Sequence, residues 1–311
     1  MESAKSLSVW MAIPASIRGL IRTMRPKQWA KNGFVFVAIL FDQQLFEPSA
    51  FLRVLGAFIA FSFTASAVYL MNDLVDIERD REHPKKKHRP LPSGQLPIPM
   101  AQAAMILLPL LAVGGAFFLN IELVIVLAAY LALQIAYSFY LKNVVIIDVF
   151  CIAAGFVLRT IAGIVVITVT TFSSWLYVCV GLLALFLAIG KRRQELILLQ
   201  LSEADITKVR DTYKGYNLPL LDDMLRMVVT SAAVAYTLYA TEAETILIEA
   251  DPALMLLTVP FVYYGLFRYM YVIHRLGKGG DPTEVLFEDR PLQVTIASWV
   301  GVIIILLYIV G

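Results

Sequence analysis

The sequence has little charge, little cysteine and little histidine for its length of 311 residues. Charged residues make up 16% of the chain and hydrophobic residues 59%, whereas soluble domains contain about 25% charged residues. A soluble chain of this size would still need polar residues to cover its surface, so a lipid-facing exterior explains the apolar excess. Cys151 and Cys179 both lie in apolar runs, which excludes a disulfide framework and a cysteine-based zinc site. Neither a P-loop nor a glycine-rich nucleotide-binding turn is present.

Apolar residues are gathered into nine segments that approach the roughly 20 residues needed to span a membrane. The predicted spans are 29–46, 51–71, 98–118, 121–138, 144–168, 172–190, 224–243, 252–273 and 292–310. We therefore predict an all-α polytopic membrane protein, with residues 29–311 forming one domain of nine transmembrane helices. Residues 1–28 are basic and amphipathic without a cleavage site, so we expect a cytoplasmic segment and not a signal peptide. The long gaps at 72–97 and 191–223 are the expected catalytic loops.

Lysine and arginine are strongly segregated between alternate loops. They occur in the N-terminal segment and in the second, fourth, sixth and eighth loops, whereas the other loops and the C-terminus hold no Lys or Arg, and acids lie in or beside several of these loops. Because positively charged loops stay on the cytoplasmic side, the N-terminus is predicted to be cytoplasmic and the C-terminus outside. We expect this multi-pass protein in the inner (plasma) membrane. The net charge of only +2 conceals the segregation.

A stripe of carboxylates opens the second cytoplasmic loop. If the helix of the second span continues, Asp73, Asp76 and Asp80 share one face, with Asn72 one turn before Asp76. Carboxylates on one stripe repel one another unless a cation lies among them, and oxygen ligands without His or Cys suit Mg²⁺. The alternative is a solvated helix end in a charged loop. The basic run at 83–90 follows directly, and acids for a metal followed by cations for phosphate are expected around a diphosphate.

The run NDLVDIERDREHPKKKHRPLPSG, at 72–94, resembles the first aspartate-rich motif, NDxxDxxxD, of the UbiA superfamily of intramembrane prenyltransferases. The resemblance implies a nine-helix bundle with a central cavity open to the cytoplasm. It also implies that Asn72, Asp73, Asp76 and Asp80 hold Mg²⁺ and a diphosphate leaving group. Most of that superfamily carries a second acidic motif, DxxxD, after span six, where this chain reads KRRQEL at 191–196. A second Mg²⁺ site needs carboxylates, whereas Lys and Arg bind a phosphate directly.

Five further stretches resemble one branch of the superfamily. These are Arg25–Asn32, Tyr137–Ser138 with Leu141–Asn143, Asp148–Gly163, Lys191–Leu196, and Asp281–Leu286 running on to Asp289–Arg290. Members of that branch join a polyprenyl phosphate, of decaprenol or undecaprenol, to C1 of phosphoribosyl pyrophosphate and release pyrophosphate. The product is a lipid-linked pentose precursor for cell-envelope glycan. Two alternatives remain: a prenyltransferase that acts on an aromatic or lipid acceptor and predicts a second acidic motif, and a transporter for an anionic lipid.

The resemblance and the charges together assign the candidate site residues. Asp73, Asp76, Asp80 and Arg159 are the expected catalytic residues, with Mg²⁺ as cofactor. Phosphoribosyl pyrophosphate is assigned to Lys85, Arg89, Tyr137, Lys142, Asp148, Arg159, Lys191 and Arg192. Polyprenyl phosphate is assigned to Lys27, Gln28, Lys31 and Asn32. No nucleic acid is expected as a partner.

Two of these assignments have structural alternatives. In an α-helix Lys27 and Lys31 lie on one face and can hold a lipid phosphate, but basic residues beside a Trp also anchor spans at the interface. Arg159 shares a helical face with Asp148, about 16 Å deeper in the membrane. An intramembrane arginine costs at least about 2.5–3.5 kcal/mol on insertion scales, so it is a functional candidate. Its alternative is a structural salt link.

Overall fold

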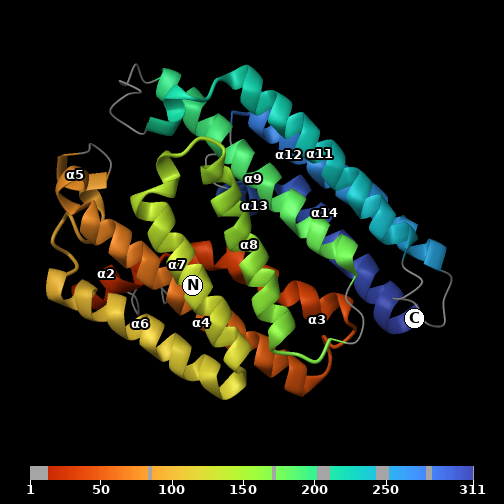
Figure 1. Cartoon of the computed structure of the whole chain (residues 1–311), viewed down its shortest axis with the longest axis horizontal. Helices are drawn as coiled ribbons and strands as arrows, with labels where there is room; N and C mark the ends of the chain where they lie inside the picture. Colours follow the sequence, from red (N-terminus) through yellow and green to blue (C-terminus); the bar gives the residue numbers. More distant parts are fainter. Residues whose placement is uncertain are drawn as a thin grey trace, which may run out of the picture. The chain divides into compact units, whose positions relative to one another are not determined.

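A computed structural model describes residues 13–82, 86–169, 173–201, 211–242, 252–277 and 282–310. Every regular element within these ranges is a helix (Figure 1). The chain divides into two compact units. Unit 1 comprises the residues up to Gly33 together with Leu55–Ile135, and unit 2 comprises Phe34–Val54 together with Ala136–Gly311.

Unit 1 packs its helices around a small apolar core. Its elements are α2 (Ala15–Met24), the first part of the 3₁₀ helix η1 (Pro26–Phe36), most of α4 (Pro48–Val75), α5 (Ile77–Glu82), the short 3₁₀ helix η2 (Lys86–His88), α6 (Ile98–Leu119) and most of α7 (Ile121–Phe139). Leu70 of α4 and Ala101 of α6 are buried in the core with Leu91, which lies between η2 and α6. Phe118 of α6 is 88% exposed, as expected of a side chain that faces lipid.

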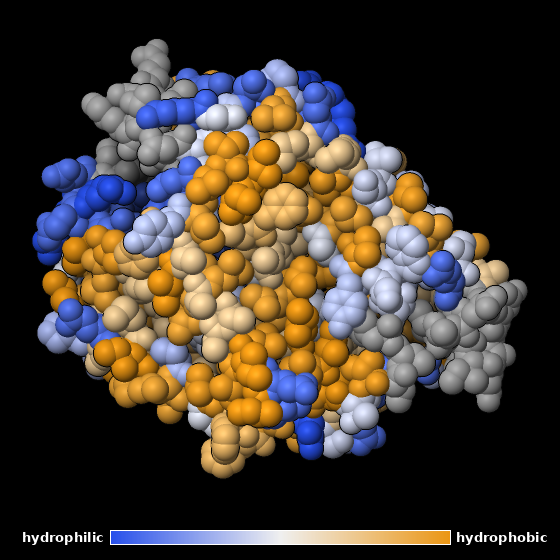
Figure 2. All heavy atoms as spheres, viewed as in Figure 1, coloured by the Kyte–Doolittle hydropathy of each residue, from blue (hydrophilic) through white to orange (hydrophobic). Residues whose placement is uncertain are grey.

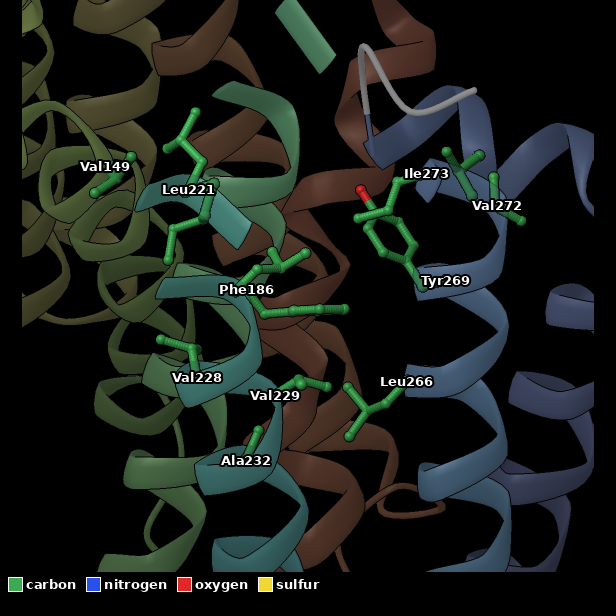
Figure 3. Packing of buried hydrophobic residues seen from close by; sticks show 14 of the residues in the cluster. Val149, Phe186, Leu221, Val228, Val229, Ala232, Leu266, Tyr269, Val272 and Ile273 are labelled. Atoms are coloured by element: carbon green, nitrogen blue, oxygen red, sulfur yellow. The ribbon is translucent and has the colours of Figure 1, made fainter. Parts of the chain in front are cut away.

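Unit 2 holds the longer part of the chain. Its elements are α3 (Val37–Phe41), η3 (Leu141–Asn143), α8 (Ile147–Val165), α9 (Ser174–Leu201), η4 (Asp211–Lys214), α11 (Leu218–Thr241), η6 (Pro252–Thr258), α12 (Val259–Arg275), α13 (Pro282–Glu288), α14 (Arg290–Ile305) and the π-helix η7 (Leu306–Val310). Figure 3 shows its main core, where Phe186 of α9, Val229 of α11 and Leu266 of α12 meet. The Tyr269 and Phe186 rings pack with centroids 5.2 Å apart.

One close approach in unit 2 depends on a glycine. A Cβ atom on Gly163 of α8 would lie 1.9 Å from the carbonyl oxygen of Val35 in η1. Only a residue without a side chain lets the two backbones come so near each other. Gly163 therefore sets the distance between α8 and the chain before α3.

The prediction of an all-helical membrane protein is confirmed. Within the described ranges, seven helices are long and apolar enough to cross a membrane by length and composition. The predicted spans at 29–46 and 224–243 are not among them, so the count of nine is not confirmed. The second coincides with α11, whose apolar stretch includes several Thr, Ser and Tyr residues. Figure 2 shows apolar side chains over most of the visible face, while hydrophilic side chains gather over α5.

The predicted span at 29–46 begins as a 3₁₀ helix, η1, and becomes α-helical only in α3. Because residues i and i+3 eclipse in a 3₁₀ helix, Trp29 and Asn32 share one side. Trp29 Nε1 donates to Ser66 Oγ at 3.1 Å and Asn32 Nδ2 donates to Ser62 Oγ at 2.9 Å, which pins this side of η1 to α4. The expectation that Lys27 and Lys31 lie on one helical face was therefore wrong. They lie about a third of a turn apart in this geometry.

Helix α9 continues well beyond the predicted end of its span at residue 190. It runs to Leu201, so the KRRQEL stretch is helical and not part of a loop. Its apolar face continues with it, because Leu196 is 2% exposed and packs in the main core of unit 2. The basic residues of this stretch are therefore held at fixed angles around a helix axis.

Candidate functional site

A carboxylate cluster in unit 1 contains two of the predicted metal ligands. Its members are Arg25, Asp73, Asp80, Lys86 and Arg89. Arg89 Nη1 lies 3.3 Å from Asp73 Oδ1 and 2.7 Å from Asp80 Oδ2, so one nitrogen contacts both carboxylates. Asp73 and Asp80 are 4% and 1% exposed. Arg25 Nη2 adds a second contact to Asp73 at 2.6 Å, and Lys86 Nζ adds one to Asp80 at 3.6 Å.

Helix geometry decides which carboxylates meet. The backbone N–H groups of Asp76 and Asp80 donate to the carbonyls four residues earlier, so the helical turn continues from α4 into α5. At 3.6 residues per turn, Asp73 and Asp80 differ by only about 20° around the axis, whereas Asp76 is turned by about 60° from Asp73. The Asp76 side chain is 40% exposed and lies 3.7 Å from Arg79. Asn72 is half-buried one residue before Asp73.

Arg25 reaches the cluster because of its backbone conformation. It ends α2 in the left-handed region, with φ 55°, and its N–H donates to the carbonyl of Arg22. The guanidinium lies over the Tyr69 ring at 4.9 Å from the centroid, as in a cation–π contact. Arg25 lay in a stretch singled out by sequence but outside the predicted site, because no local pattern pairs it with a residue 48 positions away.

The donor set of this cluster fits a hard divalent ion. Two nearly buried carboxylates already converge on a single cationic nitrogen, and Mg²⁺ in proteins usually takes one or two carboxylates and completes its shell with substrate phosphate and water. Within the described ranges, no three His, Cys, Asp or Glu side chains come together in a metal-binding arrangement. The fit is therefore to a site that a phosphorylated ligand completes. Lys85, predicted to contact that ligand, lies outside the described residues.

The residues predicted for the lipid phosphate line different sides of η1. Lys27 is exposed and Gln28 and Lys31 are half-buried, whereas Asn32 is 1% exposed and donates to Ser62. The structure therefore keeps Lys27, Gln28 and Lys31 accessible. The amide of Asn32 instead holds η1 against α4.

In unit 2, Arg192 of α9 contacts three side chains, and one of these contacts a fourth. Its Nε donates to Asp148 Oδ2 at 2.5 Å, its Nη2 donates to Tyr137 OH at 2.5 Å, and its Nη1 donates to Glu195. Tyr216 OH donates to the other oxygen of Asp148 at 2.7 Å. We call these five residues the Arg192 cluster. Asp148 and Arg192 are 0% and 1% exposed, so three predicted ligands of phosphoribosyl pyrophosphate meet one another in a buried ion-pair network.

Tyr216 is the member of this cluster that the sequence did not single out. Burial, and then its hydrogen bond to Asp148, raise the pKa of Tyr216 well above its usual value. The phenol therefore stays protonated and acts as a donor to Asp148. A tyrosine after a charged loop carries no local signal for this role, since Asp148 is 68 residues away.

The other predicted ligands in unit 2 are spread over three helices. The Lys191 side chain is 31% exposed, and its Nζ lies 3.9 Å from Glu195 Oε1. Lys142 is half-buried in η3. Arg159, 6% exposed, donates from Nη1 to the carbonyl of Gly155 at 2.7 Å and lies 5.4 Å from the centroid of the Phe156 ring.

The third cation of the KRRQEL stretch has a structural contact. Arg193 Nε donates to Asp222 Oδ1 of α11 at 2.5 Å, and His274 Nε2 lies 3.3 Å from the same oxygen. Glu195 and Asp222, two acids of this region that a second metal site could draw on, are therefore both held by arginine.

Comparisons with known proteins agree on one family. The model of the UbiA prenyltransferase family matches residues 33–283. The decaprenyl-phosphate phosphoribosyltransferase of Corynebacterium glutamicum is 35% identical over 295 residues, which cover 94% of this chain and 87% of the relative. The proteins of the same name from Mycolicibacterium smegmatis and Mycobacterium tuberculosis are 33% and 31% identical over 92% of this chain, and over 92% and 93% of their own lengths.

Solved structures share the fold. A UbiA homolog from Archaeoglobus fulgidus, bound to GPP and Mg²⁺, superposes with a TM-score of 0.68 at 16% identity, covering 94% of this chain and 100% of that one. A digeranylgeranylglyceryl phosphate synthase superposes with a TM-score of 0.62 at 17% identity, covering 94% and 98%. At these identities the likeness concerns the fold alone. With the family match over most of its length, this chain belongs to the UbiA prenyltransferase family.

Proposed function

We propose that this protein transfers the 5-phosphoribosyl group of phosphoribosyl pyrophosphate to a polyprenyl phosphate and releases pyrophosphate. The observation that carries the proposal is the similarity, over nearly the whole chain, to three relatives that bear the name decaprenyl-phosphate phosphoribosyltransferase. The basic KRRQEL stretch in place of a second acidic motif supports it, because both substrates are polyanions.

The carboxylate cluster of unit 1 is assigned to pyrophosphate and Mg²⁺. Asp73 and Asp80, with Asp76 and Asn72 nearby, would hold the ion, which when bound neutralises charge on the phosphate oxygens. Arg89 contacts both carboxylates. Its guanidinium is well suited to turn to the pyrophosphate oxygens, since it offers several donors in one plane.

The residues of unit 2 are assigned to the phosphoribosyl group. Lys142 and Lys191 are accessible enough to contact its phosphates, and Arg159 supplies a buried positive charge. Asp148, with Tyr137 and Arg192, faces a ribose hydroxyl in this proposal. The bond from C1 to pyrophosphate breaks with its electron pair on the leaving group, through an oxocarbenium-like state. An oxygen of the lipid phosphate forms the new bond, and because it is already ionised the reaction needs no general base.

The polyprenyl phosphate is assigned to the membrane-proximal segment η1. Lys27, Gln28 and Lys31 would bind its phosphate at the depth of the lipid headgroups, while the apolar tail stays in the membrane. Asn32 supports this segment through Ser62. The placement requires the N-terminal side of η1 to be cytoplasmic, in the inner membrane, as the segregation of Lys and Arg predicts.

Transfer of a labelled ribose tests the proposal directly. Purified protein in detergent is incubated with Mg²⁺, polyprenyl phosphate and phosphoribosyl pyrophosphate labelled in the ribose. Label is expected in the organic phase together with stoichiometric release of pyrophosphate. If no label is extracted, while a prenyl diphosphate is consumed in the presence of an aromatic acceptor, the protein is a prenyltransferase and the proposal is wrong.

A further inference from the structure

We propose that Tyr216 is a positioning residue for the phosphoribosyl group. Together with Thr212 it fastens the segment 211–216 to the start of α8 and so determines where Asp148 and Lys142 lie. The inference rests on the proposed function, since both of these residues are assigned there to phosphoribosyl pyrophosphate. Tyr216 acts through them and makes no substrate contact of its own.

The Tyr216 hydroxyl makes two hydrogen bonds that join the two segments. It accepts from the backbone N–H of Ile146 at 2.7 Å and donates to Asp148 Oδ1 at 2.7 Å. Tyr216 itself is 5% exposed. Since Arg192 occupies the other oxygen of Asp148, the carboxylate is fixed from both sides. Loss of the phenol would leave Asp148 free to rotate about its remaining contact.

The backbone at Ile146 gives this contact a particular task. Ile146 has φ 71° and ψ −47°, which a β-branched residue adopts only where the surrounding structure holds it. Packing of its side chain does not stabilise this conformation, because Ile146 is 45% exposed. The hydrogen bond from the Ile146 N–H to the Tyr216 hydroxyl stabilises it. Ile146 also stands at the start of α8, so its conformation sets the direction in which Asp148 enters the helix.

A second contact fixes the same segment to η3. Thr212 Oγ1 donates to the carbonyl of Lys142 at 3.3 Å, and Thr212 is 0% exposed. Between the two contacts Gly215 allows a close approach, because a Cβ atom there would lie 2.5 Å from Val145 Cγ2. The segment 211–216 thus touches the chain before α8 at Lys142, Val145 and Ile146.

Tyr216→Phe removes the hydroxyl and preserves the ring, so it tests both hydrogen bonds at once. Tyr239→Phe is the matched control, because Tyr239 is also buried, at 1% exposed, and among the described residues no hydrogen bond reaches its hydroxyl. Steady-state kinetics are measured separately against phosphoribosyl pyrophosphate and against polyprenyl phosphate. Hydrogen exchange of the peptide at 142–150 reports on the Ile146 amide without any need for turnover.

We expect Tyr216→Phe to raise the KM for phosphoribosyl pyrophosphate, and so to lower kcat/KM for it, by about tenfold or more, as for loss of a hydrogen bond to a charged group. The KM for polyprenyl phosphate should stay at the wild-type value, and exchange at 142–150 should accelerate. Tyr239→Phe should behave as wild type in all three measurements. A merely structural role would reduce the folded fraction and leave both KM values unchanged.

Unchanged KM for phosphoribosyl pyrophosphate, or equal changes toward both substrates, would overturn the proposal. Thr212→Val supplies a second variant should Tyr216→Phe not fold, with the same selective effect expected through Lys142. Failure of the proposed function gives a different result, because wild-type protein itself would then transfer no label. Hydrogen exchange at 142–150 would still accelerate in Tyr216→Phe in that case, because it depends on the two hydrogen bonds of the Tyr216 hydroxyl and not on turnover.

Discussion

Arg89→Met tests whether an internal cation occupies the place of the proposed metal ion. The substitution keeps the length of the side chain but removes the nitrogen that contacts both Asp73 Oδ1, at 3.3 Å, and Asp80 Oδ2, at 2.7 Å. Asp73 keeps its ion pair with Arg25 at 2.6 Å, so losing the Arg89 contact to Asp73 destabilises the protein little. Asp80 is 1% exposed and keeps Lys86 only at 3.6 Å, so it loses its shorter charge-assisted hydrogen bond.

The expected magnitude follows from these contacts. One hydrogen bond to a charged group is worth about 1.5–3 kcal/mol, and removing a partner from a fully buried pair costs about 3–5 kcal/mol. Because the Arg89 side chain is 35% exposed, the lower range applies, and we expect a destabilisation of about 2 kcal/mol without divalent ions. Mg²⁺ should recover most of that loss in the variant. The affinity of the site for Mg²⁺ in the absence of substrate should rise by about tenfold, because Arg89 no longer competes with the ion for the two carboxylates; a tenfold change corresponds to about 1.4 kcal/mol.

Thermal unfolding in detergent with and without Mg²⁺, and binding of Mn²⁺ followed by electron paramagnetic resonance, measure the two effects. Arg81→Met is the control, because Arg81 pairs with Glu78 at 2.7 Å on the exposed side of α5. Its unfolding and its Mn²⁺ affinity should match those of the wild type. If Arg89→Met binds Mn²⁺ no more tightly than Arg81→Met, the metal site does not lie at Asp73 and Asp80.

Three further predictions concern single residues. Gly163→Ala should lower the free energy of unfolding by about 2 kcal/mol or more, because its Cβ would lie 1.9 Å from the Val35 carbonyl oxygen. Gly181→Ala is the control, because no neighbouring atom of the described residues would lie within 4 Å of its Cβ; equal unfolding midpoints for the two variants would contradict the close approach at Gly163. Asp76→Asn should abolish turnover with little effect on unfolding, since its side chain is 40% exposed and its ion pair with Arg79 is long, at 3.7 Å; full turnover at saturating Mg²⁺ would exclude Asp76 as a ligand. Burial, then the Asp148 hydrogen bond, raise the pKa of Tyr216, so its contribution to stability is complete below its usual value of about 10 and is lost only as the pH rises toward the raised value. The ratio of kcat/KM between wild type and Tyr216→Phe should accordingly be constant from about pH 7 to 9, and a ratio that changes in this range would mean that the phenol titrates there.

Properties that depend on short stretches of chain could be predicted without the structure. Hydropathy over about 20 residues identifies membrane helices, and the acidic motif at 72–80 is contiguous, so both can be recognised from a short stretch of sequence. The same local reasoning assumed an α-helix across 29–46. There the sequence alone was insufficient, because the first part of this stretch is a 3₁₀ helix that Trp29 and Asn32 join to α4 by hydrogen bonds. The partners of these hydrogen bonds are 30 or more positions apart, so no local pattern predicts them.

The sequence by itself determined the class of the protein, its family and the kinds of charge that each loop carries, since each is a property of composition or of a contiguous motif. Only the tertiary structure decided how those charges are paired. Arg89 was expected on a phosphate and bridges Asp73 to Asp80, while Arg192 lies 44 residues from Asp148 in sequence and is buried against it. The physical reason is the high cost of an unpaired charge in a buried place, which makes each such residue take a partner that the packing of distant helices brings near.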